Sequence, residues 1–178
     1  MKTNILEYIR TVENYPKQGV EFYDLNSLFA QPIWNTCANE LATKIQSIFN
    51  KNGEITHVAG IESRGFVVGG VLANLIDVPF IMVRKKGSKY PGALLEQAYK
   101  LEYGQDTLVL QEGILGHTSR VIIADDLLAT GGSTLATKKL IEQTKAKVLG
   151  VVVLLELAYI NSDNKQELQN IIAHTVVK

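Results

Sequence analysis

The stretch from Arg120 to Thr134, RVIIADDLLATGGST, constrains the fold of this chain more than any other. It begins with apolar residues whose number and β-branching are typical of a buried strand. Two adjacent carboxylates, Asp125 and Asp126, end that strand, and a short loop then leads to Gly131-Gly132 and two hydroxyl residues. A helical segment follows to about Lys145. This order predicts a strand–turn–helix unit with paired acids and a glycine-rich turn at the carboxyl end of the strand.

The composition of this turn is typical of a phosphate-binding site. Glycines allow backbone N–H groups to converge, and the N-terminus of a helix favours an anion. An ordinary strand-to-helix turn would share part of the pattern, but paired acids suit the hydroxyls of a ribose beside the phosphate. Two other phosphate motifs are absent, because Gly132 stands where a P-loop has lysine and no G-x-G-x-x-G occurs.

Strand-like and helix-like segments alternate along the chain with a period of about 30 residues. Apolar patterns predict buried strands over 55–61, 80–83, 121–124 and 148–155 and helices over 2–13, 32–49, 65–76 and 133–145. This alternation predicts an α/β fold with a mostly parallel central sheet flanked by helices on both faces. Residues 94–111 are expected to form a hairpin that turns at Gly104-Gln105 and lies outside the parallel pattern as a flap.

Composition limits the classes of function. Lys and Arg number 18 in total, as do Asp and Glu, so no net charge favours nucleic acid or an anionic membrane as a partner. The single cysteine, Cys37, excludes an internal disulfide framework and a cysteine-rich zinc site. No apolar run approaches the roughly 20 residues of a membrane span, and residues 1–10 lack the apolar core of a signal peptide. We therefore expect a cytoplasmic enzyme of one domain, residues 1–178.

Residues 121–133 resemble the signature with which the phosphoribosyltransferase family binds phosphoribosyl pyrophosphate (PRPP). The run DDLLATGG is similar to the version found in adenine phosphoribosyltransferases. The resemblance extends over nearly the whole chain and implies the type I phosphoribosyltransferase fold. It also implies that Asp125 and Asp126 bind the ribose hydroxyls. The loop that would hold the 5′-phosphate consists of Ala129, Thr130, Gly131, Gly132 and Ser133.

The segment Glu62-Ser63-Arg64-Gly65 directly follows a predicted strand and begins a helix. An arginine there can bind a diphosphate through two hydrogen bonds, while nearby N–H groups share its negative charge. The alternative is a surface ion pair between Arg64 and Glu62. The segment resembles the pyrophosphate loop of the family, which implies substrate contacts from Glu62 and Ser63 and a catalytic role for Arg64. The same resemblance implies a cis peptide bond between Glu62 and Ser63.

The loop over 84–92 contains the basic residues Arg84, Lys85, Lys86 and Lys89. A solvated surface loop or a weak nucleic-acid patch would have this composition, but aromatic stacking residues and net positive charge are lacking. Next to a diphosphate, mobile basic side chains could neutralise the leaving group. The loop resembles the shorter family motif Arg-Lys-x-Gly-Lys-Leu-Pro-Gly. Arg84, Lys85 and Lys89 are therefore candidate substrate-binding residues, and the sequence leaves open which lysine reaches pyrophosphate.

Two further segments resemble the parts of the family that enclose the base. The run YKLEYG, within a flap over about 84–111, implies that Glu102 exchanges a proton with purine N7 and that Tyr103 packs over the closed site. The run VEFYD, within a hood over about 1–31, implies that Phe22 stacks on the purine and that the backbone of Glu21 and Tyr23 recognises adenine. Tyr23 replaces the usual arginine of the family. The alternatives are a solvent-facing Glu102 and a Phe22 that anchors the core.

The resemblance implies the reaction adenine + PRPP → AMP + pyrophosphate, a step of purine salvage, in a homodimer. Mg²⁺ would be held mainly by PRPP or pyrophosphate and water, consistent with the absence of a carboxylate cage from the sequence. His57, His117 and His174 share no metal-ligand spacing. Transfer to xanthine or hypoxanthine and a PRPP-sensing regulator without catalysis are alternatives, as is a plain nucleotide-binding module. The segments around Phe22 and Glu102 favour adenine, and neither a DNA-binding domain nor a strongly basic face is apparent.

Overall fold

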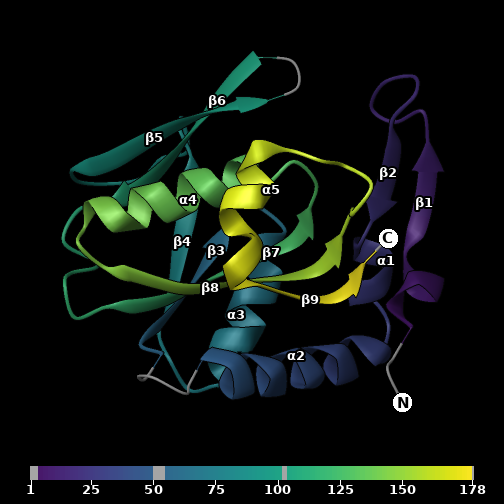
Figure 1. Ribbon diagram of the computed structural model, residues 1–178, viewed down its shortest axis with the longest axis horizontal. Coiled ribbons are helices and arrows are strands. Elements are labelled where there is room, and N and C mark those ends of the chain that lie inside the picture. The colour runs from purple at the N-terminus through teal and green to yellow at the C-terminus, as the bar shows by residue number, and fades with distance from the viewer. Residues whose placement is uncertain (1–3, 50–54, 102–103, 178) are drawn as a thin grey trace.

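The computed structural model of this protein describes residues 4–49, 55–101 and 104–177. Within them, one sheet has seven strands and is covered by helices on both faces (Figure 1). The strands are β3 (His57–Ile61), β4 (Phe80–Lys85), β5 (Leu94–Leu101), β6 (Gly104–Gln111), β7 (Arg120–Leu128), β8 (Lys147–Glu156) and β9 (Ile172–Val177). Their order in the sheet is β5-β6-β4-β3-β7-β8-β9.

The centre of the sheet is parallel. The neighbours β4, β3, β7, β8 and β9 all pair in parallel, whereas β6 and β5 add to the free side of β4 in antiparallel pairs. The predicted α/β fold with a mostly parallel sheet is therefore confirmed. Its predicted core strands are present, and β9 adds a strand next to β8 that the sequence did not clearly predict.

Alternating side chains of the central strands pack into two separate cores. Ile122 and Ala124 of β7 face the cluster formed with α2 (Ile33–Phe49) and α3 (Gly65–Leu75). Val121 and Ile123 face the opposite cluster, formed with α4 (Gly132–Gln143) and α5 (Asp163–Leu168). Successive strand residues point to opposite faces, so a strand covered on both sides must be apolar throughout. This is why β7 is a continuous hydrophobic run up to its two acids.

The order of the strands determines where a ligand can bind. From β3 the chain continues to β4 on one side, whereas β7 lies on the other side of β3 and leads on to β8. In an open parallel sheet, a crevice forms beyond the carboxyl ends of two strands where the direction of winding reverses. Here those two ends belong to β3 and β7.

The N-terminal prediction was wrong in part. Instead of a helix over 2–13, the described residues form the 3₁₀ helix η1 (Ile5–Tyr8) and the strand β1 (Arg10–Glu13). β1 pairs antiparallel with β2 (Glu21–Asp24), which leads into the short helix α1 (Asn26–Phe29). The β1–β2 ribbon stands at one side of the sheet (Figure 1). Long-range pairing thus overrides a local helical spacing, as strand formation depends on context.

The hairpin lies outside the parallel pattern, as predicted, because β5 and β6 pair antiparallel with each other and β6 pairs antiparallel with β4. It extends the central sheet through the pairing of Arg84 and Lys85 of β4 with Val109 and Leu108 of β6. Leu108 and Leu110 are fully buried in the core beneath α4. Gly104 and Gln105, the predicted turn, both belong to β6.

No helix in the described part of the chain has the length and apolarity needed to cross a bilayer.

Candidate active site

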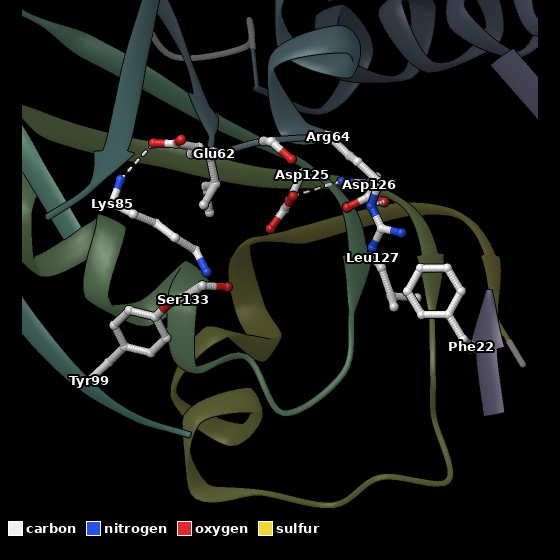
Figure 2. Close-up of a pocket in the computed structure, with 11 residues that line it drawn as sticks. Phe22, Glu62, Arg64, Lys85, Tyr99, Asp125, Asp126, Leu127 and Ser133 are labelled. Atoms are coloured by element: carbon white, nitrogen blue, oxygen red, sulfur yellow. Dashed lines mark hydrogen bonds and ion pairs between the residues drawn. The ribbon is translucent and has the colours of Figure 1, made fainter. Parts of the chain in front are cut away.

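A pocket of about 600 Å³ opens at the carboxyl ends of β3 and β7 (Figure 2). Residues from β2, β3, β4, β5 and β7 meet there, so segments that are far apart in the sequence converge on one crevice. The pocket is lined by Phe22, Ile61, Glu62, Ser63, Arg64, Lys85, Tyr99, Asp125, Asp126, Leu127 and Ser133.

The twin acids form the floor of this pocket. Asp125 is 8% exposed and Asp126 is 4% exposed, and Asp125 Oδ1 accepts a hydrogen bond from Asp126 N at 2.9 Å. Burial raises the pKa of Asp125 well above its ordinary value, and the negative charge of Asp126 raises it further. Burial also raises the pKa of Asp126, although the positive charge of Arg64 opposes this effect. Two such carboxylates are poised to accept hydrogen bonds from neighbouring hydroxyl groups.

Gly65 allows α3 to begin directly against these acids. A Cβ atom at this position would lie 2.9 Å from both the Ala124 carbonyl oxygen and Asp125 Oδ1. Any larger residue would force the start of α3 away from β7. The glycine therefore keeps Arg64, the residue before it, next to Asp126.

Arg64 contacts three parts of the pocket at once. Its Nε lies 2.6 Å from Asp126 Oδ2, and its guanidinium carbon lies 5.3 Å from the centre of the Phe22 ring. Its Nη1 also donates to the Tyr23 carbonyl oxygen at 3.4 Å. Arg64 thus pairs with Asp126 and not with Glu62, which was the surface alternative considered from the sequence.

The peptide bond between Glu62 and Ser63 is cis, as expected. The Glu62 carboxylate points toward β4, where it accepts hydrogen bonds from Lys85 N at 2.8 Å and from the Ser88 hydroxyl at 3.0 Å (Figure 2). Arg84 Nε lies 3.6 Å from the same carboxylate. Glu62 therefore links the loop after β3 to the basic loop, while Ser63 lines the pocket.

The glycine-rich loop opens α4 beside the twin acids. Gly131 caps this helix with φ 75°, a left-handed conformation that glycine adopts without strain. A smaller hollow of about 140 Å³ runs along the loop and is lined by Ala129, Thr130, Gly131, Gly132, Ser133 and neighbouring residues. Thr134 also lines it, and its buried hydroxyl has no hydrogen-bond partner within the described part of the chain. The hollow thus combines a helix N-terminus with an unused hydroxyl, as expected for an anion site.

Only one of the candidate lysines lines the pocket. The side chain of Lys85 extends across the pocket toward Ser133, and its ammonium lies 3.1 Å from Asp106 (Figure 2). Lys86 is directed outward to Glu96, with 2.7 Å between the ammonium and the carboxylate. Lys89 is exposed, and its carbonyl oxygen accepts a hydrogen bond from Arg84 Nη1 at 3.3 Å. Arg84 itself lies over the Tyr90 ring at 5.4 Å.

Tyr99 was not among the predicted site residues, although it begins the YKLEYG run. Its hydroxyl lies 3.3 Å from Asp106 Oδ2, so Tyr99 and Lys85 share one carboxylate. Burial, with a smaller effect from Asp106, raises the pKa of Tyr99 to about 12. Strand alternation could have revealed this residue. Leu95, Gln97 and Tyr99 are every second residue of β5 and so lie on one face of the strand, and Leu95 on that face packs against the core.

The hood residues lie at the opposite wall. Phe22 lines the pocket and makes an edge-to-face contact with Tyr15, with 5.1 Å between ring centres. Tyr23, at the position of the family arginine, is buried, and its hydroxyl donates to the Glu21 carboxylate. Burial, the Glu21 bond and Tyr159 all raise the pKa of Tyr23. The predicted residues Glu102 and Tyr103 lie outside the described residues.

Comparison with known proteins agrees with this geometry. The model of the phosphoribosyl transferase domain family matches residues 32–176. An adenine phosphoribosyltransferase of Mycoplasmopsis pulmonis is 40% identical over 162 residues, which covers 91% of each chain. One from Caenorhabditis elegans is 40% identical over 166 residues, 93% of this chain and 88% of that relative. The crystal structure of the Saccharomyces cerevisiae enzyme, complexed with an imino-altritol bisphosphate and adenine, superposes with a TM-score of 0.89 at 30% identity, over 97% of this chain and 96% of that chain.

Proposed function

This chain belongs to the phosphoribosyltransferase family, and on that basis we propose that it transfers the phosphoribosyl group of PRPP to adenine, giving AMP and pyrophosphate. The observation that carries the proposal is the arrangement around β7. Twin buried carboxylates lie beside a glycine-rich helix N-terminus, and Arg64 forms an ion pair with Asp126. The carboxylates can bind the hydroxyls of a ribose and the helix N-terminus can bind its 5-phosphate. The guanidinium of Arg64 can bind a diphosphate on C1′.

PRPP would bind along β7 and the loop that follows it. The carboxylates of Asp125 and Asp126 would accept hydrogen bonds from the 2′- and 3′-hydroxyls, a role supported by the low exposure of both side chains in the lining of the pocket. The 5′-phosphate would occupy the hollow along residues 129–133. There the α4 N-terminus, the N–H groups of the loop and the hydroxyls of Ser133 and Thr134 can neutralise and bind it.

Adenine would stack on Phe22. This ring lies across the pocket from the phosphate loop, with Leu127 beside it (Figure 2). The backbone groups of Glu21 and Tyr23 would recognise the base, and the hydrogen bond from Arg64 to the Tyr23 carbonyl supports the accessibility of that group from the pocket. Because backbone groups would recognise the base, the replacement of the family arginine by Tyr23 is compatible with recognition of adenine.

The reaction exchanges one bond at C1′ for another. Adenine N9 forms a bond to C1′ as the bond from C1′ to the pyrophosphate oxygen breaks. The purine releases a proton from N7, and Glu102 would accept it. Charge develops on the departing pyrophosphate, so fixed cations close to it lower the barrier. Arg64 and Lys85 would supply them, since both line the pocket and Lys86 and Lys89 do not. Holding the base and the sugar in line for the transfer lowers the barrier further.

Mg²⁺ is the proposed cofactor. In the described part of the chain no group of three or more His, Cys, Asp or Glu side chains could hold a metal. Mg²⁺ commonly binds through one or two carboxylates together with substrate phosphates and water, and the Asp125–Asp126 pair fits that requirement. Bound there through PRPP oxygens and water, the ion would neutralise charge on the diphosphate.

The experiment that tests the function is incubation of the protein with PRPP, Mg²⁺ and single free bases, with chromatography of the products. AMP and pyrophosphate from adenine, in equal amounts, are the expected result. The relatives named above do not favour transfer to xanthine or hypoxanthine. IMP or XMP as the main product, or no nucleotide at all, would contradict the proposal.

We further propose a homodimer. Val67 and Leu75 of α3 and Met82 of β4 are apolar and 37 to 42% exposed, and we propose that they lie in the interface between two copies of the chain. Light scattering after size exclusion should give twice the chain mass, and Val67→Glu should give the monomer. Ile114→Glu, at a loop residue that is 41% exposed, is the matched control and should remain dimeric.

The remaining proposals concern organisation and location. We propose one domain in which residues 1–31 form a hood and residues 84–111 a flap over the pocket, supported by Phe22 and Tyr99 on its opposite walls. The cytoplasm is the proposed compartment, because a highly charged sugar diphosphate does not cross a bilayer unaided and must be used where it is made. Imaging of a tagged chain in its own cell would test this.

A further inference from the structure

The phosphate loop, residues 129–133, is contacted by a cluster of side chains that do not line the main pocket. Ser162, the N-cap of α5, donates from its hydroxyl to the Thr130 carbonyl oxygen at 2.6 Å and accepts from Lys165 N at 3.2 Å. The Lys165 ammonium donates to the Leu157 carbonyl oxygen at 2.9 Å and lies 3.1 Å from Glu156 Oε1. Its side chain and that of Glu156 are only 11% and 16% exposed.

We propose that Glu156, Ser162 and Lys165, the loop brace, are positioning residues that fix the phosphate loop for the 5′-phosphate. The proposal rests on the proposed function, since it assigns a second tier of residues to the same PRPP site. None of the three lines the main pocket or the hollow along the loop, so they act through the loop and not on the substrate.

The hydrogen bond to Thr130 determines the direction of one peptide group. The peptide bond from Thr130 to Gly131 is trans, and in a trans peptide the C=O and the next N–H point in opposite directions. Ser162 holds the carbonyl toward α5, so the Gly131 N–H is directed away from α5. A loop without this bond could flip the peptide and turn a carbonyl oxygen, rather than an N–H donor, toward the phosphate.

Lys165 supports the same loop in a second way. A Cβ at Gly131 would lie 3.4 Å from Lys165 Cγ and from Leu168 Cδ1, so α5 packs closely against this glycine. The ammonium of Lys165 then ties α5 to the end of β8 through Glu156 and the Leu157 carbonyl. Leu157 N in turn donates to the Leu128 carbonyl oxygen at 3.0 Å, just before the loop begins. The loop is thereby fixed both at its start and at Thr130.

The chain offers a matched control for the Ser162 hydroxyl. Thr144, at the far end of α4, donates to the Ile141 carbonyl oxygen at 2.6 Å and accepts from Ala146 N at 3.3 Å. Both hydroxyls therefore donate to one backbone carbonyl and accept from one backbone N–H. Only Ser162 makes its bond to the phosphate loop, so Ser162→Ala and Thr144→Val separate a positioning role from a general loss of stability.

The test measures steady-state kinetics and PRPP binding by calorimetry on the full chain. Ser162→Ala should raise KM and Kd for PRPP about five- to ten-fold, the effect of one hydrogen bond. It should leave kcat and KM for adenine within about two-fold, because the 5′-phosphate does not react and its binding is lost equally in ground and transition states. Ser162→Thr should restore PRPP affinity, and Lys165→Met combined with Glu156→Gln should weaken it without leaving a buried charge unpaired.

Three outcomes would overturn the proposal. Unchanged PRPP affinity in Ser162→Ala, or an equal loss in Thr144→Val at the same thermal stability, would overturn the loop brace alone. A wild-type chain that binds no PRPP would overturn the proposed function and the loop brace with it. The first two results require a wild type that binds PRPP, so the failures are distinguishable.

Discussion

The guanidinium of Arg64 bridges two walls of the pocket, with its Nε 2.6 Å from Asp126 and its charge above the face of Phe22. One side chain therefore contacts the proposed ribose group and the proposed base group. It also neutralises part of the charge of the buried acids, as its opposing effect on the pKa of Asp126 indicates. We expect this arginine to connect sugar binding, base binding and departure of pyrophosphate.

Arg64→Gln should lower kcat/KM for PRPP by about 100-fold, because a fixed cation next to the developing charge is lost. Arg64→Lys should recover only part of the activity, since an ammonium cannot make the same paired hydrogen bonds. Steady-state assays with varied PRPP measure the effect. Arg10→Gln removes an arginine from another Arg–Asp pair, largely exposed and outside the pocket, and should stay within about two-fold. A similar loss in both variants would argue against a special role for Arg64.

Lys85→Met and Lys86→Met form a pair of neighbouring substitutions with opposite expectations. Lys85→Met should raise KM for PRPP by about 10-fold, as expected for the loss of one charged contact. Lys86→Met should change it by less than about two-fold, because Lys86 is directed outward to Glu96 and exposed pairs contribute little. Binding of pyrophosphate, measured by calorimetry, should follow the same order. The reverse order would assign the contact to Lys86.

Asp125→Asn should weaken PRPP binding but stabilise the folded chain relative to wild type, increasingly so as the pH rises. The folded pKa of Asp125 is raised above its ordinary value of 3.8. Above about pH 4 the unfolded carboxyl has released its proton while the folded one still holds it, so the contribution of Asp125 to stability falls until the raised pKa is passed. Each pKa unit between the two states corresponds to about 1.4 kcal/mol.

Urea unfolding of both forms across about pH 4.5 to 8 measures this difference. The amide of the Asp125→Asn variant cannot titrate, so the advantage of the variant over wild type should grow with pH and then level off. Asp77→Asn, at a turn residue outside the pocket, controls for the loss of one carboxylate. A constant difference at every pH would mean that Asp125 is ionised throughout.

Phe22→Leu should raise KM for adenine by about 10-fold and leave KM for PRPP within about two-fold. Stacking of a base on an aromatic ring contributes about 1–3 kcal/mol, and leucine offers no such face. Tyr15→Leu removes the ring that contacts Phe22 from outside the pocket and should have the smaller effect. An equal rise in KM for both substrates would indicate that Phe22 serves the fold and not the base.

Several features of the site followed from local sequence. The acids of β7, the turn at Gly131 and the segment Glu62–Arg64 each lie at the end of a strand whose apolar run is long enough to identify it. Parallel strands align their carboxyl ends at one edge, so these segments had to meet. The apolar and polar periodicity of a strand or helix is a local property. This is why the strands that end at these segments could be predicted from the sequence.

Other features depended on which segments pair. Pairing with β6 extends β4 through Arg84 and Lys85, and strand alternation then directs Lys85 toward the pocket on the face shared with Ile81 and Val83. The N-terminal residues form a ribbon only because β2 returns alongside β1. The local pattern of these segments does not specify their partner strands, so no period in the sequence could predict them.

The sequence by itself determined the α/β layering, the position of the phosphate loop and the identity of the acids, because burial and turn formation depend on neighbouring residues. Tertiary structure alone decided that Arg64 pairs with Asp126, that Lys85 and Tyr99 share Asp106, and that Ser162 holds Thr130. Each of these contacts depends on residues from different elements. Its geometry follows from how the strands and helices pack, which local sequence does not encode.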